Sequence, residues 1–128
     1  MRNMDGRPQM MLTGIVLDAP DARELAAFYR RLLGWSAVQE EQDWVKLGAP
    51  GGGPGLSFQT EKHYVRPVWP SQPTEQQMSI HLDIKVEDLP RACAHAEQAG
   101  AVRAEFQPQE HVRVYLDPAG HPFCLYVD

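Results

Sequence analysis

The sequence repeats itself at an offset of 67 residues, and this internal repeat constrains the fold more than any other feature. The segment 14–21 (GIVLDAPD) falls on 81–88 (HLDIKVED), and the same offset places Ser57 on Cys124 and Leu47 on Val114. Each copy reads as a strand, a helix and then further strands. Because 128 residues is the size of one ordinary domain, the repeat predicts a single domain built from two equivalent halves.

Both copies carry the start and stop signals of a helix. In the first copy, Asp21 is a good N-cap with Glu24 three residues later, and apolar residues follow at helical spacing until Gly34. In the second copy, Asp88 caps a helix that ends at Gly100. The segments that read as strands are 12–17, 44–47, 56–60, 79–86, 112–116 and 122–127. The pattern predicts an α+β fold.

The order of these signals also predicts the domain organisation. Residues 1–11 are polar and read as a flexible N-terminal arm. The single domain then covers 12–128, with one module at 12–60 and the other at 79–128. Residues 61–78 form the connecting loop between the modules.

The connecting loop is richer in aromatic residues than a plain linker. It contains three prolines, but it also holds His63, Tyr64 and Trp69. Either these rings pack the loop onto the protein surface, or the loop forms a lip over a cleft in which Trp69 or Tyr64 contacts a ligand. The second interpretation is reasonable because loops on rigid scaffolds often carry binding residues.

Composition argues against several classes of function. The net charge is −5 and no basic run is present, so we expect no nucleic-acid partner. No apolar stretch approaches the roughly 20 residues of a membrane-spanning helix, so we expect no membrane partner. The N-terminal residues lack the apolar core of a secretory signal, which predicts a cytoplasmic protein. Cys93 and Cys124 are then expected to be reduced thiols.

Two segments resemble a known superfamily. The strand at 81–89 (HLDIKVEDL) and the tail at 117–125 (DPAGHPFCL), on a background of two βαβββ copies, are similar to the vicinal oxygen chelate superfamily. That superfamily includes glyoxalase I, bleomycin-resistance proteins and extradiol dioxygenases, and the chain is most similar to its small glyoxalase-like domains. The resemblance implies two βαβββ modules that form a cupped, mixed and mostly antiparallel sheet with the helices outside. It also implies a homodimer.

The resemblance identifies four positions where metal enzymes of the superfamily place their ligands. These positions are the first and last strands of each copy, which here hold Gly14, Ser57, His81 and Cys124. Only His81 matches the usual ligand. A catalytic zinc site uses about three protein ligands, and His81 with Cys124 gives two, so a third would have to come from Asp83 or His63. We therefore expect no metal cofactor, with a divalent metal bound at His81 as the alternative.

Several residues have more than one interpretation. His81 is a hydrogen-bonded pocket histidine, a ligand contact or a metal donor, and Cys124 is a small core residue or a thiol bordering the cleft. Either Val114 or Tyr115 faces the cleft, because neighbouring strand residues point to opposite sides. The remaining histidines are not expected in the site: His121 reads as exposed in a turn, and His95 and His111 show no partner.

The hypothesis that follows is a small-molecule-binding protein of the glyoxalase and bleomycin-resistance type. It would sequester an aromatic or natural-product-like ligand without metal, as the resemblance implies. The first alternative is a metal-dependent lyase, isomerase or dioxygenase that uses His81. The second is a metal-free enzyme that uses His81, Asp83 or Cys124 as base or nucleophile. The predicted ligand-binding residues are Trp44, Ser57, His63, Tyr64, Trp69, His81, Asp83 and Cys124.

Overall fold

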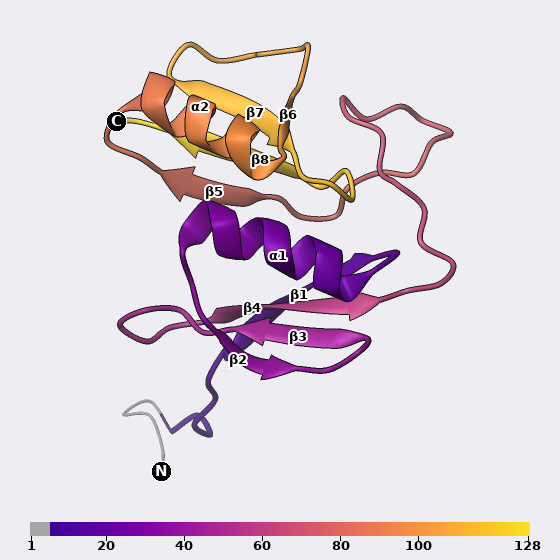
Figure 1. Cartoon of the computed structure of the whole chain (residues 1–128), viewed down its shortest axis with the longest axis vertical. Coiled ribbons are helices and arrows are strands. Elements are labelled where there is room, and N and C mark those ends of the chain that lie inside the picture. The colour runs from indigo at the N-terminus through magenta and orange to yellow at the C-terminus, as the bar shows by residue number, and fades with distance from the viewer. Residues whose placement is uncertain (1–5) are drawn as a thin grey trace.

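The repeat in the sequence folds into two halves with the same order of elements (Figure 1). The structure, a computed structural model, describes residues 6–128. The first half contains β1 (Gly14–Ala19), α1 (Ala22–Leu33), β2 (Ala37–Glu40), β3 (Trp44–Leu47) and β4 (Gly55–Thr60). The second half contains β5 (Leu82–Lys85), α2 (Leu89–Ala99), β6 (Val102–Arg103), β7 (Val112–Leu116) and β8 (Pro122–Tyr126).

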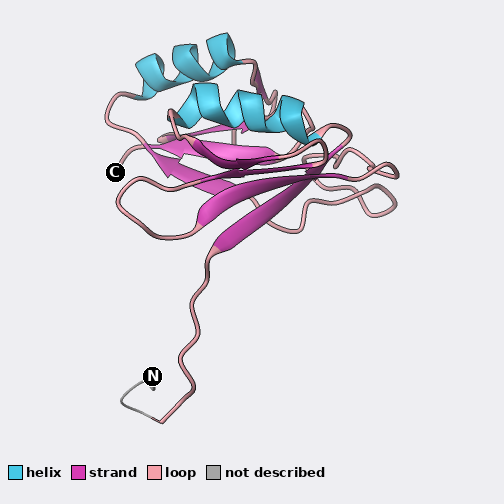
Figure 2. Ribbon diagram, turned by 60° about the horizontal axis from the view of Figure 1, so that its bottom comes forward, coloured by secondary structure: helices cyan, strands magenta, loops and turns pink. Residues whose placement is uncertain are grey.

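Each half contributes one mixed, four-stranded sheet. The strand orders are β1-β4-β3-β2 and β5-β8-β7-β6, and in each sheet only the first and last strands of the module pair in parallel. This topology confirms the prediction of an α+β fold with two βαβββ modules, although the two sheets are separate. Both helices lie on the same side of the sheets (Figure 2). We call the opposite side of each sheet its open face.

The 67-residue offset holds for the first and last strands of each module, but not for β3 and β7, which come between them in the sequence. Lys46 pairs with Ser57 across β3 and β4, whereas Val114 pairs with Cys124 across β7 and β8. Lys46 is therefore the structural equivalent of Val114, and the predicted match of Leu47 with Val114 is wrong by one residue. The cause is one extra residue between β3 and β4 in the first half.

The register of β7 and β8 also decides whether Val114 or Tyr115 lies on the open face. Val114 is opposite Cys124 and shares its face. Tyr115 points to the helix side, where its hydroxyl donates a hydrogen bond of 2.5 Å to Glu97 Oε2 on α2. Burial and this carboxylate raise the pKa of Tyr115 above its ordinary value.

The helix caps form where the sequence predicted them. The Asp21 side chain accepts a hydrogen bond from the Arg23 amide at 3.0 Å, which satisfies one of the free N–H groups of the first turn of α1. Gly34 ends α1 with φ of 74°, a left-handed conformation that glycine adopts without strain. Asp88 caps α2 through the Arg91 amide. An aspartate therefore caps the start of each helix, and in α1 the Thr60 hydroxyl also accepts a hydrogen bond from the Ala22 amide at 3.0 Å.

Aromatic rings between the helices and the sheets join the two halves. Tyr29 of α1 stacks on Phe58 of β4 with ring centroids 5.4 Å apart, and Phe28 lies 6.0 Å from Phe123 of β8. All four side chains are fully buried. Helix α1 therefore packs against strands of both modules, so one core serves the two sheets.

Polar contacts between the helices add to this junction. The Arg31 guanidinium donates to the Ala99 carbonyl at 2.8 and 3.0 Å, and His95 Nε2 lies 3.0 Å from the Leu32 carbonyl oxygen. The expectation that His95 has no partner is therefore wrong. The two helices hold each other through backbone carbonyls at their C-terminal regions.

Two strands begin later than the apolar pattern predicted. The first starts at Gly14 rather than at Leu12, which is exposed. The strand expected at 79–86 is limited to β5, so His81 lies directly before it. Short strands such as β6, with two residues, leave too little pattern to be found in the sequence. In the part of the chain that the structure describes, neither helix has the length and apolar character needed to cross a bilayer.

Candidate functional site

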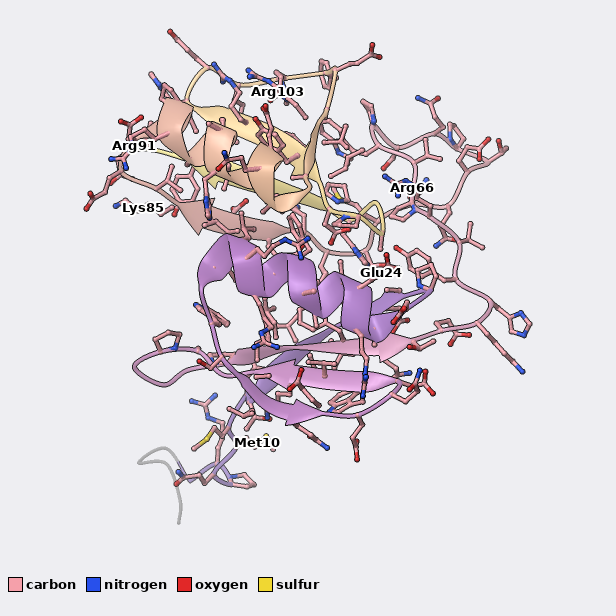
Figure 3. The ribbon with its side chains drawn as sticks, in the orientation of Figure 1. Met10, Glu24, Arg66, Lys85, Arg91 and Arg103 are labelled. Carbon is pink, nitrogen blue, oxygen red and sulfur yellow. The ribbon has the colours of Figure 1, made fainter. Side chains whose placement is uncertain are left out.

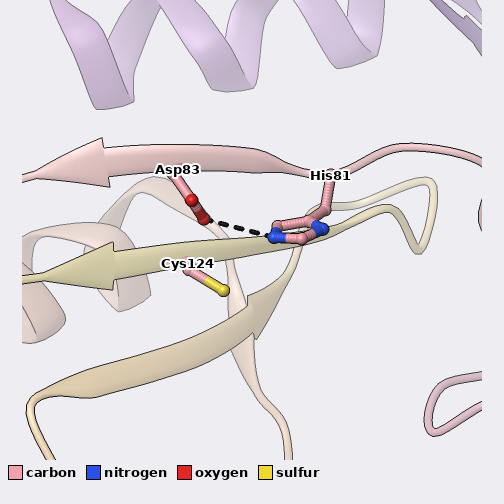
Figure 4. A group of neighbouring side chains, drawn as sticks. All are labelled: His81, Asp83 and Cys124. Carbon is pink, nitrogen blue, oxygen red and sulfur yellow. Dashed lines mark ion pairs between the residues drawn. The ribbon is translucent and has the colours of Figure 1, made fainter.

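Three side chains with metal-binding or catalytic chemistry meet on the open face of the second sheet (Figure 4). His81 and Asp83 are two residues apart and therefore lie on the same side of the strand. Cys124 is opposite Asp83 in the parallel pairing of β5 and β8. His81 Nε2 is 3.2 Å from Asp83 Oδ1, and one donor atom from each of the three residues lies within 4.8 Å of the others.

The electrostatics of this cluster keep the thiol protonated. Burial of Cys124, followed by the nearby Asp83 carboxylate, raises the pKa of the thiol above its ordinary value. The His81 and Asp83 side chains are 41% and 62% exposed, so solvent screens their mutual attraction. Because a thiol rather than a thiolate is favoured at neutral pH, Cys124 is a weak nucleophile in this arrangement.

The donor set fits a transition metal better than Mg²⁺. Donor atoms around a tetrahedral zinc ion are roughly 3.3–3.6 Å apart, given Zn–N, Zn–O and Zn–S distances of about 2.0–2.3 Å. His81 Nε2 and Asp83 Oδ1 are already at 3.2 Å, so only a movement on the order of 1 Å would bring in the thiol. An imidazole and a sulfur donor favour zinc-like ions over Mg²⁺. His81 and Cys124 offer two metal ligands, and the Asp83 carboxylate offers the third.

A hollow that we call the β5 hollow lies beside this cluster. It has a volume of about 180 Å³, and it adjoins a second hollow of about 240 Å³ that shares His81, Gln109 and Cys124. Trp69 reaches the β5 hollow from the connecting loop, and its ring lies 5.8 Å from Phe106. The complete lining is Trp69, Met78, His81, Pro108, Gln109, Val114, Pro122 and Cys124.

The predicted ligand-binding residues do not all meet at this place. Trp69, His81, Asp83 and Cys124 come together around the two adjoining hollows, whereas Trp44, Ser57 and His63 do not line them.

The other three lie elsewhere in the first half or in the loop. Trp44 belongs to the first sheet, where its indole N–H donates to Gln39 Oε1 at 3.0 Å. Ser57 is buried on β4, opposite Val16 of β1. His63 is exposed, and its backbone amide bonds to Glu61.

Tyr64 belongs to a separate buried network. The Asp117 carboxylate, which is fully buried, accepts hydrogen bonds from the Tyr29 hydroxyl at 2.8 Å and from the His121 amide at 2.9 Å, and its Oδ2 lies 2.9 Å from His121 Nδ1. His121 Nε2 is 3.3 Å from the Tyr64 hydroxyl, which donates to the Ala119 carbonyl at 2.8 Å. His121 is therefore half-buried and bonded, and the prediction of an exposed turn residue is wrong.

This network anchors the connecting loop to the turn before β8. Arg66, labelled in Figure 3, donates from Nη1 to the Pro118 carbonyl at 3.0 Å. Its aliphatic stem also covers Gly120, where any added Cβ would collide with it. Tyr64 and Arg66 thus hold the connecting loop in place. They precede Trp69 by five and three residues.

Some of the residues around the site could not be predicted from the sequence. Gln109 and Pro108 come from the irregular segment between β6 and β7, so no periodicity places them. Asp117 could have been recognised, because an aspartate at the start of an Asp-Pro-x-Gly turn commonly bonds to backbone amides two or more residues on. Here its Oδ1 accepts from the Ala119 amide at 2.9 Å.

Comparisons with known proteins agree with the geometry. The glyoxalase-like domain family matches residues 14–126. A glyoxalase/bleomycin resistance protein/dioxygenase family enzyme from Burkholderia phytofirmans PsJN superposes with a TM-score of 0.73 at 14% identity, over 92% of this chain and 98% of that one. A glyoxalase-related enzyme from Fulvimarina pelagi gives 0.68 at 18% identity, over 94% and 89% of the two chains.

A third solved structure has a name linked to drug resistance. The fosfomycin resistance protein FosX from Mesorhizobium loti superposes with a TM-score of 0.66 at 12% identity, over 94% of both chains. A search of curated proteins found no match. At these identities the solved structures establish the fold alone, while the family match spans most of the chain. The chain therefore belongs to the glyoxalase-like domain family, within the vicinal oxygen chelate superfamily.

Proposed function

We propose that this protein binds a small organic molecule with a planar, apolar part in the β5 hollow. The observation that carries the proposal is the position of Trp69, which the connecting loop brings to the same hollow as His81 and Cys124. Ligand sites are typically concave and mostly apolar, with a few polar groups that fix orientation. The β5 hollow has this composition, because six of its eight lining side chains, those other than His81 and Gln109, carry no charged or amide group.

The lining residues have distinct roles in this proposal. Trp69 and Val114 supply apolar surface against which a ring can stack or pack. His81 and Gln109 offer hydrogen-bonding groups at the border with the adjoining hollow. Asp83, 3.2 Å from His81, orients the imidazole and favours a proton on its Nε2. With Nε2–H directed at Asp83, the other ring nitrogen of a neutral His81 accepts a hydrogen bond, so a ligand with a ring and a hydrogen-bond donor matches His81.

Sequestration of such a ligand fits the resistance proteins among the structural relatives. The names of the Burkholderia phytofirmans enzyme and of FosX include bleomycin resistance and fosfomycin resistance. We further propose that the ligand is an aromatic or natural-product-like compound, and that the protein holds it without metal as a cytoplasmic homodimer.

Tryptophan fluorescence tests the ligand site. We expect planar bicyclic aromatic compounds to quench the emission of Trp69 in a saturable way. Trp69→Phe will lose this quenching, whereas Trp44→Phe will retain it, because Trp44 lies on the other sheet. His81→Ala will weaken binding about three- to tenfold, as expected for the loss of one hydrogen bond. Quenching that follows Trp44 instead of Trp69 would remove the β5 hollow from consideration.

A second function, metal-dependent chemistry at the same cluster, is favoured by the three donors within 4.8 Å. His81, Asp83 and Cys124 would hold the ion on the open face. A bound zinc-like ion would supply a Lewis acid that polarises a substrate oxygen, as a lyase or isomerase requires, whereas a dioxygenase would need a redox-active ion such as iron. The exposed side of the cluster leaves room for a substrate.

Metal titration at several pH values distinguishes this second function from metal-free ligand binding. Zn²⁺ should bind at one ion per chain, and Cys124→Ser should weaken it by more than about tenfold, while Cys93→Ala should not. Because the thiol pKa is raised and binding needs the thiolate, affinity should increase with pH, by about tenfold per unit while the pH stays below that pKa. Competition with a chromophoric chelator measures both effects. An unchanged Zn²⁺ affinity in Cys124→Ser would exclude this set of three ligands.

A further inference from the structure

Three exposed apolar side chains converge on a hollow that does not include His81. This hollow, which we call the β1 hollow, has a volume of about 200 Å³. Val16, Val65 and Ile80 line it, and they are 46%, 59% and 54% exposed. They come from β1, the connecting loop and the segment before β5, so distant parts of the chain meet here. Exposed apolar residues that gather in one place indicate a binding site, whereas scattered ones do not.

The β1 hollow also holds an acidic side chain that has no partner. Asp18 lines the hollow from β1 and is exposed, and within residues 6–128 its carboxylate makes no hydrogen bond or ion pair. Among the described residues, the lining contains no lysine or arginine that could neutralise it. A carboxylate at the edge of an apolar surface attracts a cation that also carries apolar groups.

The third element of the β1 hollow is a neutral aromatic ring. Tyr64 lines the hollow, and its hydroxyl is occupied by the Ala119 carbonyl. Burial, followed by the Asp117 carboxylate, raises the pKa of Tyr64 to about 12; the Arg66 charge opposes this rise, and Asp18 adds a smaller one. The phenol therefore stays neutral at physiological pH. Its ring can attract a cation through the negative face of the π-system.

We propose that the β1 hollow is a second binding site, which takes a small amphiphilic organic cation. The ammonium group lies at Asp18 and the Tyr64 ring, and the apolar body covers Val16, Val65 and Ile80. The net charge of −5 adds a general attraction for cations. This site is independent of the ligand proposed for the β5 hollow, although Met78 lines both.

Two probes of similar shape but different charge test the proposal. Benzylammonium and benzyl alcohol are titrated into ¹⁵N-labelled protein at neutral pH, and amide shifts are followed. We expect saturable shifts at Val16, Asp18 and Ile80, with benzylammonium binding about tenfold more tightly than the alcohol. Asp18→Asn should reduce the affinity for benzylammonium to that for benzyl alcohol.

Matched controls separate this site from non-specific attraction and from the β5 hollow. Glu105→Gln removes an exposed carboxylate outside the β1 hollow and should leave the affinity unchanged. Equal binding by Asp18→Asn, no saturable shift with benzylammonium, or shifts centred on Trp69 and His81 would each overturn the proposal. If Trp69 shows no quenching by aromatic compounds while Asp18-dependent binding persists, the function proposed for the β5 hollow fails and this site remains.

Discussion

Replacing Asp117 with alanine will destabilise the protein by about 3–5 kcal/mol, the range expected when one partner of a buried, hydrogen-bonded charge is removed. The carboxylate is fully buried and serves Tyr29, His121 and two backbone amides of its own turn. Without it, these donors remain inside the protein with no acceptor. Urea unfolding followed by circular dichroism measures the loss.

Two variants make the Asp117 prediction specific. Asp117→Asn keeps the volume and one acceptor oxygen, so it should lose less stability than the alanine variant. Asp43→Ala removes an exposed aspartate and should change the free energy of unfolding by less than about 0.5 kcal/mol. A loss below about 1 kcal/mol for Asp117→Ala would mean that water or nearby groups replace the carboxylate.

Gly55→Ala will also be strongly destabilising, by about 2–3 kcal/mol, because the new methyl group has no space. Its Cβ would lie well inside 3.0 Å from the backbone carbonyl oxygen of Leu47, which cannot rotate away. The loss should appear as a lower urea midpoint with an unchanged slope.

The register partner of Gly55 provides the matched control. Gly14 pairs with Gly55 across β1 and β4, but a Cβ on Gly14 would find its nearest neighbours at 3.7 and 3.9 Å, an ordinary contact distance. Gly14→Ala should therefore change stability by less than about 1 kcal/mol, in either direction. Equal effects at the two glycines would contradict the steric explanation.

The repeat and the helix caps predicted two equivalent α+β halves, and the family resemblance implied their mixed sheets with the helices outside. Asp21, Asp88 and Gly34 act locally, through bonds to amides or carbonyls a few residues away, so their roles can be read from spacing alone. The correspondence between β3 and β7 could not be predicted, because the length of the connection between β3 and β4 decides it. That single extra residue caused the wrong match of Leu47 with Val114.

The candidate site was predictable only in part. The resemblance implied His81 and Cys124, and strand alternation added Asp83, and the structure brings these three side chains together. Trp44 failed as a member of this group because β3 belongs to the other sheet. Which of these residues bind a ligand stays a prediction.

His121 shows why buried polar networks are hard to predict. A turn of proline, alanine and glycine is typical of an exposed segment. His121 is nevertheless hydrogen-bonded to Asp117, and it contacts Tyr64, which lies on a loop more than fifty residues away in sequence. No local pattern contains that contact.

The duplicated architecture keeps its ionisable cluster in one copy only. Where the second sheet has His81, Asp83 and Cys124, the first has glycine, valine and serine at positions 14, 16 and 57. Natural selection can therefore alter the first sheet without disturbing those donors. The ligand preference of the first sheet, including the one proposed for the β1 hollow, can thus change while the three donors on the second sheet stay in place.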